Sequence, residues 1–207
     1  AALNSLRCGN NPGMVGELDE YGKLKTPDVH AEVFKQLTDS LKTSQVTEVD
    51  FSSCGIGAVA LGHLSDWVRD ATAAVADLNI SEAVIGDAGA TLVEAISASS
   101  SLKFITIGKG LRLPLKDNYG SDVLDAAGKG IEAGGATVIA WWLTTDAAAG
   151  IVSVNCLANH FGDEGLATLL TAIEGTSVRS LCGLNEGQTT ADFSGQNLSP
   201  IDCKIMK

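Results

Sequence analysis

The segment 151–173, IVSVNCLANHFGDEGLATLLTAI, contains the two patterns that decide the fold. It begins with apolar residues at Ile151, Val154 and Cys156, separated first by two free positions and then by one. After a turn, apolar residues recur at spacings of three and four between Leu166 and Ile173, which is the period of a single buried helix face. The sequence therefore predicts a short strand, a turn and a helix in that order.

The strand pattern recurs along the chain at a nearly constant period. Clear copies are Val46-Val49-Phe51, Val75-Leu78-Ile80 and Leu102-Ile105-Ile107, and weaker ones are Leu3-Leu6-Cys8 and Val178-Leu181. The starts at positions 46, 75 and 102 are 29 and 27 residues apart, and 151 and 178 are again 27 apart. A fixed period of this length is typical of stacked repeats that bury one another's apolar faces.

This pattern resembles the leucine-rich-repeat family, in its ribonuclease-inhibitor-like branch, where a full helix follows each short parallel strand. The phrase 156–165, CLANHFGDEG, carries the resemblance most clearly. The family places an Asn or Cys three residues past the last apolar strand position, where its side chain ties down the turn. Asn11, Cys54 and Asn159 stand there, whereas Ala83 and Gly110 depart from the rule. The resemblance implies an α/β fold, a leucine-rich-repeat solenoid with a curved parallel sheet and outer helices.

A second phrase recurs in the irregular parts, at 18–23 (LDEYGK), 124–129 (LDAAGK) and, more weakly, 191–196 (ADFSGQ). We interpret these as long repeats, which brings the expected number of parallel strands to about nine. The Pro-containing segments 10–21 and 108–121 are expected to be loops that leave the sheet. The prediction is one leucine-rich-repeat domain over 1–207 that lacks one or both terminal caps, so that the chain is a piece of a longer one or a partner covers its ends.

The amino-acid composition argues against some classes of partner and indicates the compartment. The chain of 207 residues has 25 Asp and Glu against 14 Lys and Arg, a formal charge of -11, which argues against nucleic acid as a partner. No apolar run approaches the roughly 20 residues that span a bilayer, so no membrane span is expected. Five scattered cysteines without C-x-x-C spacing predict free thiols in an intracellular compartment, with cytoplasm and organelle interior not distinguishable.

The candidate binding surface is the concave face, where the free positions of successive strands line up. The residues expected there are Glu48, Asp50, Asp77, Asn79 and Glu82 together, with Ser153 and Asn155 further along. Clustered carboxylates repel one another, and a basic partner or a cation would relieve that repulsion; a merely solvated face is the alternative. Trp141 and Trp142 form a second candidate, because consecutive helical residues point about 100° apart and an exposed Trp would anchor an interface.

The sequence patterns that would indicate an enzyme are weak. His30, His63 and His160 lack the partners of a Ser-His-Asp or Cys-His arrangement, and the glycine-rich segment 108–113 lacks the order of a phosphate loop. We therefore expect no enzyme, no metal and no cofactor. The predicted function is a non-catalytic protein-binding module, for a partner with a basic surface or a large complex; the alternative is a structural or accessory subunit of a large multiprotein assembly. The family also includes activating proteins of the small GTPase Ran, which leaves GTPase activation as a third possibility.

Overall fold

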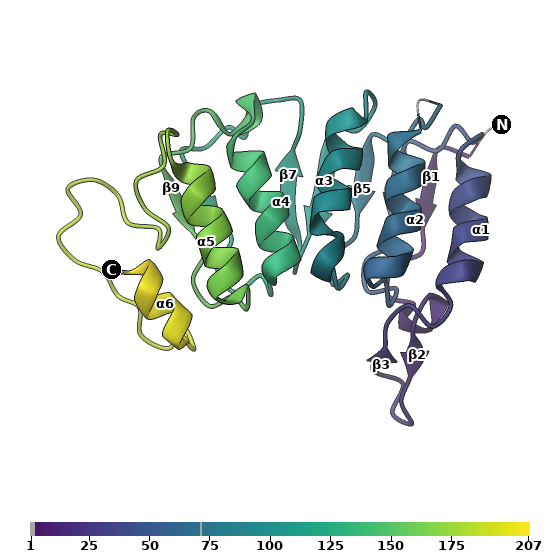
Figure 1. The fold of residues 1–207 in the computed structure, drawn as a ribbon, viewed down its shortest axis with the longest axis horizontal. Helices are drawn as coiled ribbons and strands as arrows, with labels where there is room; N and C mark the ends of the chain where they lie inside the picture. The colour runs from purple at the N-terminus through teal and green to yellow at the C-terminus, as the bar shows by residue number, and fades with distance from the viewer. Residues whose placement is uncertain (1–2, 71) are drawn as a thin grey trace.

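The computed structural model describes residues 3–70 and 72–207 and has two layers, with strands on one side and helices on the other (Figure 1). The strands are β1 (Ser5–Arg7), β2 (Glu17–Leu18), β3 (Leu24–Thr26), β4 (Glu48–Asp50), β5 (Asp77–Asn79), β6 (Phe104–Ile107), β7 (Leu111–Pro114), β8 (Val123–Asp125) and β9 (Ser153–Asn155). The α-helices are α1 (Ala31–Leu41), α2 (Ala58–Arg69), α3 (Gly89–Ala98), α4 (Ala133–Leu143), α5 (Gly162–Ile173) and α6 (Pro200–Ile205). Short 3-10 helices are η1 (Pro12–Met14), η2 (Gly86–Ala88) and η3 (Asp146–Ala148).

The main sheet has the order β1-β4-β5-β6-β7. Its first four strands are parallel and in register, so that Val49 lies beside Leu78 and Leu78 beside Ile105. These side chains are buried beneath the helices. Because neighbouring side chains of a strand point to opposite faces, the residues on either side of them face away from the helices.

The predicted leucine-rich-repeat solenoid with a curved parallel sheet and outer helices is wrong. The fold is a mixed α/β structure with one five-stranded, mostly parallel sheet and two separate two-stranded sheets, β2-β3 and β8-β9. The parallel run ends because the chain reverses at Gly108 (φ 52°) and Gly110 (φ 81°), and β7 then pairs antiparallel with β6. Since β7 occupies the free edge of β6, β8 pairs with β9 instead.

The two expected excursions also contain regular structure. The segment 108–121 includes β7, whose Leu111 and Leu113 are buried, and the segment 10–21 leads into the β2-β3 hairpin. The local strand patterns themselves are confirmed, because β4, β5, β6 and β9 form where the apolar spacing predicted them. Their apolar residues join a connected core that reaches from Val15 to Leu181.

Helices pack side by side over the strands, α1 against α2, α2 against α3, α3 against α4 and α4 against α5. Within residues 3–70 and 72–207, every helix is too short or too polar to cross a membrane. The most apolar helix, α4, has only 11 residues, which corresponds to roughly 16 Å.

Candidate functional site

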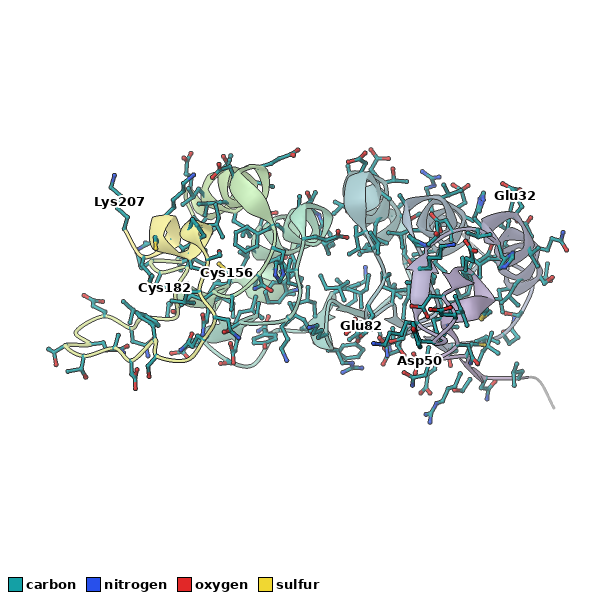
Figure 2. All side chains as sticks on the ribbon, turned by 90° about the horizontal axis from the view of Figure 1, so that it is seen from below. Glu32, Asp50, Glu82, Cys156, Cys182 and Lys207 are labelled. Atoms are coloured by element: carbon teal, nitrogen blue, oxygen red, sulfur yellow. The ribbon has the colours of Figure 1, made fainter. Side chains whose placement is uncertain are left out.

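The predicted acidic residues of β4 and β5 do come together. Glu48 lies directly beside Asp77, and Asp50 beside Asn79, on the sheet face turned away from the helices. Asp50 and Glu82 lie on this side of the molecule, whereas Glu32 lies on the helix side (Figure 2). We call Glu48, Asp50, Asp77, Asn79 and Glu82 the acidic strand face. A shallow hollow of about 200 Å³ opens on it, lined by Ser5, Arg7, Glu48, Val49, Asp50, Asp77 and Asn79.

Two arginines that the sequence interpretation did not include offset part of this charge. Arg112 donates to Asp77 at 2.5 Å, and its guanidinium carbon lies 3.7 Å from the centre of the Phe104 ring. Arg7 approaches Glu48 at 3.9 Å. Both pairs are largely exposed, so each stabilises the fold by no more than about 1 kcal/mol. Arg112 was missed because β7 was expected to be a loop.

Asp50 and Asn79 also have a structural role, because each closes the turn after its strand. The Ser52 N–H donates to Asp50 Oδ1 at 2.9 Å, and the Ser81 N–H donates to Asn79 Oδ1 at 3.0 Å. The same bond, from the residue two positions on, is accepted by Asp19 (2.9 Å), Asp125 (3.2 Å), Asn155 (3.4 Å) and Asp192 (2.9 Å). The recurring phrases at 18–23, 124–129 and 191–196 therefore mark this turn.

In these six turns the third residue after the acceptor has a positive φ, which distinguishes them from the turn at Asp70, whose carboxylate accepts the Thr72 N–H in the same way. These residues are Gly22 (76°), Ser53 (51°), Glu82 (64°), Gly128 (62°), Ala158 (57°) and Gly195 (70°). Glu82 is thus held in a backbone conformation that favours glycine. The turn therefore fixes the backbone position from which its exposed side chain extends into solvent.

The remaining predicted face residues lie elsewhere. Ser153 and Asn155 belong to β9, which is in a different sheet from β4 and β5. Ser153 is buried and its hydroxyl donates to the Leu184 carbonyl at 3.1 Å, and Asn155 is half-buried against Gly183. The segment 180–184 covers this strand, so the Ser153 side chain is closed to a partner.

The two tryptophans of α4 differ as two neighbours on a helix should. Trp142 is buried, donates from Nε1 to the Pro114 carbonyl at 2.6 Å and packs edge-on against Tyr119. It is therefore a core residue and closed to partners. Trp141 is half-buried and borders a shallow groove of about 520 Å³ between α4 and α5.

The turn-fixing role of Asn11, Cys54 and Asn159 is confirmed. Asn159 is buried; its Nδ2 donates to the carbonyls of Ala126 (2.8 Å) and Cys156 (3.0 Å), and its Oδ1 accepts the Ile131 N–H (2.9 Å). Asn11 and Cys54 each bond to the Cys8 carbonyl.

Desolvation raises the pKa of the thiols of Cys8, Cys54 and Cys156. The Cys156 thiol donates to the Leu181 carbonyl, and burial, together with the nearby Asp202 charge, raises its pKa to about 12. A thiol with such a pKa is a poor nucleophile near neutral pH. Across residues 3–70 and 72–207, no three His, Cys, Asp or Glu side chains gather as metal ligands would.

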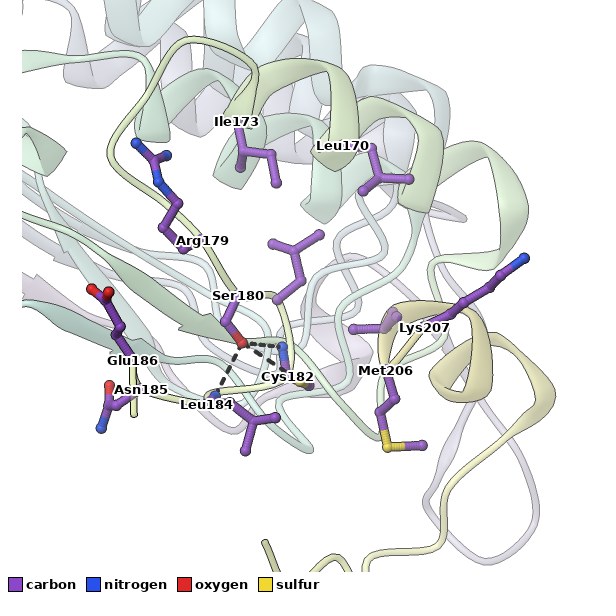
Figure 3. Close-up of a pocket in the computed structure, with 12 residues that line it drawn as sticks. Leu170, Ile173, Arg179, Ser180, Cys182, Leu184, Asn185, Glu186, Met206 and Lys207 are labelled. Atoms are coloured by element: carbon purple, nitrogen blue, oxygen red, sulfur yellow. Dashed lines mark hydrogen bonds between the residues drawn. The ribbon is translucent and has the colours of Figure 1, made fainter. Parts of the chain in front are cut away.

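A larger hollow, of about 630 Å³, lies at the other end of the molecule between α5, the segment 179–186 and α6 (Figure 3). The sequence interpretation did not predict it. We call it the C-terminal hollow. Its apolar lining is Leu170, Ile173, Leu181, Leu184, Ile205 and Met206, and its polar lining includes Arg179, Ser180, Asn185, Glu186 and Lys207.

Comparison with known sequences adds no family. No protein-family model and no curated protein matches this chain.

Proposed function

We propose that this protein is a non-catalytic binding module that holds a basic segment of a partner protein on the acidic strand face. The observation that carries the proposal is the direct pairing of Glu48 with Asp77 on neighbouring strands, beside a solvent-open hollow. Like charges directly opposite each other destabilise a sheet, so their presence there calls for a compensating cation. Arg7 and Arg112 compensate only in part.

Several features make this face suitable for docking. Strands fix the backbone of Glu48 and Asp77, and the turn geometry fixes that of Glu82, so little backbone conformational entropy is lost on binding. Arginine already binds here within the molecule, since Arg112 stacks on Phe104 and pairs with Asp77. We place the protein inside the cell, because its five cysteines are free thiols.

The test uses the full chain and a fluorescent octapeptide of alternating arginine and serine, with binding followed by anisotropy. Glu48→Gln together with Glu82→Gln removes two charges from the face, and neither carboxylate caps a turn. We expect the dissociation constant to rise about fivefold to tenfold, which corresponds to roughly 1 kcal/mol.

The matched control is Glu32→Gln with Glu94→Gln, which removes the same charge from exposed positions of α1 and α3. It should leave the affinity nearly unchanged. Equal weakening by both double variants would show that the peptide follows net charge alone, and no binding by the wild type would contradict the proposal.

The second candidate is a structural or accessory subunit of a large multiprotein assembly. It is favoured by the exposed apolar side chains of the β2-β3 hairpin and the C-terminal hollow. Size-exclusion chromatography of the protein from its native source, under mild salt, separates the two functions. A large stoichiometric complex supports the subunit, and a small salt-labile one supports the binding module.

A further inference from the structure

The β2-β3 hairpin projects from the α/β body (Figure 1). Tyr21 at its tip is 79% exposed, and Leu18 and Leu24, which pair across the two strands, are also exposed. Three large apolar side chains on one protruding hairpin have no role in the core or in the acidic strand face. Clustered exposed apolar residues of this kind mark interaction sites.

The tip of the hairpin is held in one conformation. Asp19 Oδ1 accepts the backbone N–H groups of Tyr21 (2.9 Å) and Lys23 (2.8 Å), and the Asp19 N–H donates to the Lys23 carbonyl (2.8 Å). Gly22 closes the turn with a φ of 76°. A rigid turn presents its aromatic side chain at low entropic cost, which favours Tyr21 as an anchor.

The C-terminal hollow lies toward the opposite end of the long axis. Leu170 and Met206 on its wall are 47% and 37% exposed, although both are large apolar residues. Ser180 Oγ accepts the N–H groups of Cys182 (3.3 Å) and Leu184 (3.0 Å), which fixes the wall between them (Figure 3). The hollow is thus an apolar recess with a defined shape.

We infer that the C-terminal hollow receives the hairpin tip of a second copy of this chain. Tyr21 would enter the apolar lining, with Leu18 and Leu24 against its edge. The net charges are opposite. Residues 17–26 of the hairpin have Glu17, Asp19 and Glu20 against Lys23 and Lys25, whereas the lining of the hollow has Arg179 and Lys207 against Glu186. A protein with a charge of -11 otherwise repels its own copies.

This contact joins two different surfaces, so it is head-to-tail. Such a contact leaves one hairpin and one hollow free at the ends of every oligomer, and further copies add to them. It uses none of the carboxylates of the acidic strand face, so it stands apart from the proposed function.

The test is sedimentation velocity of the full chain from about 10 µM to about 1 mM, the range in which a small interface associates. We expect the sedimentation coefficient of the wild type to rise with concentration. Tyr21→Ser and Leu170→Asp should each weaken association at least tenfold, and Tyr21→Phe should retain it. Val33→Asp, at an exposed apolar position of α1, is the matched control and should associate like the wild type.

A mixture of the two association-defective variants tests the head-to-tail contact most directly. Tyr21→Ser keeps the hollow and Leu170→Asp keeps the hairpin, so an equimolar mixture should form one-to-one dimers and nothing larger. Circular dichroism establishes that each variant is folded. A wild type that stays monomeric throughout, or a mixture that yields no dimer when the wild type associates, would overturn the inference.

Discussion

Ser65 and Ser153 show how the same side chain has opposite effects in two buried places. The Ser153 hydroxyl donates to the Leu184 carbonyl, whereas the Ser65 hydroxyl, on α2, has no hydrogen-bond partner among the residues that the structure describes. A buried polar group without a partner costs free energy, because it has given up its bonds to water.

We therefore expect Ser65→Ala to stabilise the protein by about 1 kcal/mol, since it removes the unpaired hydroxyl and favours the helix. Ser153→Ala should destabilise it by about 1 kcal/mol, because the Leu184 carbonyl then loses its donor. Urea unfolding monitored by circular dichroism measures both. Destabilisation by Ser65→Ala would mean that a water molecule satisfies its hydroxyl.

At the level of single residues, the sequence predicted the acidic strand face better than its surroundings. The constant period of the strand pattern placed Glu48 beside Asp77, and the structure has them paired. The period carries no information on what covers a strand, so the burial of Ser153 was missed. It also gives no reason to expect Arg112, which reaches Asp77 from an antiparallel strand.

Among the elements, the strands with the apolar pattern were predictable and β7 was not. Its sequence, Leu-Arg-Leu-Pro over 111–114, alternates for only four residues and follows two glycines, which is equally typical of a loop. Pro114 is tolerated because β7 is an edge strand, whose outer side has no neighbouring strand to which a backbone N–H must donate.

The start of α2 depends on a residue from a different part of the chain. Asp28 accepts the N–H groups of Gly57 (2.8 Å), Val59 (2.7 Å) and Ala60 (3.1 Å), which are free groups at the helix N-terminus. Its own φ is 65°. The carboxylate therefore acts as the cap of α2 and holds the segment after the hairpin to that helix.

A graded series at this position separates the cap from the backbone strain. Asp28→Asn tolerates the positive φ and keeps one acceptor oxygen, but its NH2 group would face a backbone N–H that the second carboxylate oxygen accepts, so it should cost about 0.5–1 kcal/mol, less than the loss of the whole cap. Asp28→Gly loses the cap alone and should cost about 1–2 kcal/mol. Asp28→Ala also strains the backbone and should cost about 1 kcal/mol more. Thermal unfolding of the four proteins gives the order, and an Ala variant as stable as Gly would contradict the backbone contribution.

At the scale of the whole molecule, two parts of the fold meet at a junction, where the main sheet ends and the β8-β9 sheet begins. The Lys109 N–H donates to the Lys129 carbonyl at 2.7 Å, and the Gly86 N–H to Glu132 Oε1 at 2.9 Å. Beside these bonds the start of α4 packs closely against η2 and α3. A Cβ atom on Gly134 would lie 2.2 Å from the Gly86 carbonyl oxygen, which is too close for any side chain.

The junction predicts opposite results for two glycine-to-alanine changes. At Gly62, in the middle of α2, an added Cβ meets no atom within 4 Å, so Gly62→Ala should stabilise the protein by up to about 1 kcal/mol. Gly134→Ala gains the same helix propensity but must push α4 away from Gly86, and we expect it to lower the stability of the protein by about 1–3 kcal/mol.

Urea unfolding measures this loss of stability, and hydrogen exchange locates it in the structure. Faster exchange should appear on both sides of the junction, in α3 and α4, because the contact holds the two sheets together. Unchanged stability of Gly134→Ala would mean that the two parts of the fold are held by their apolar core alone.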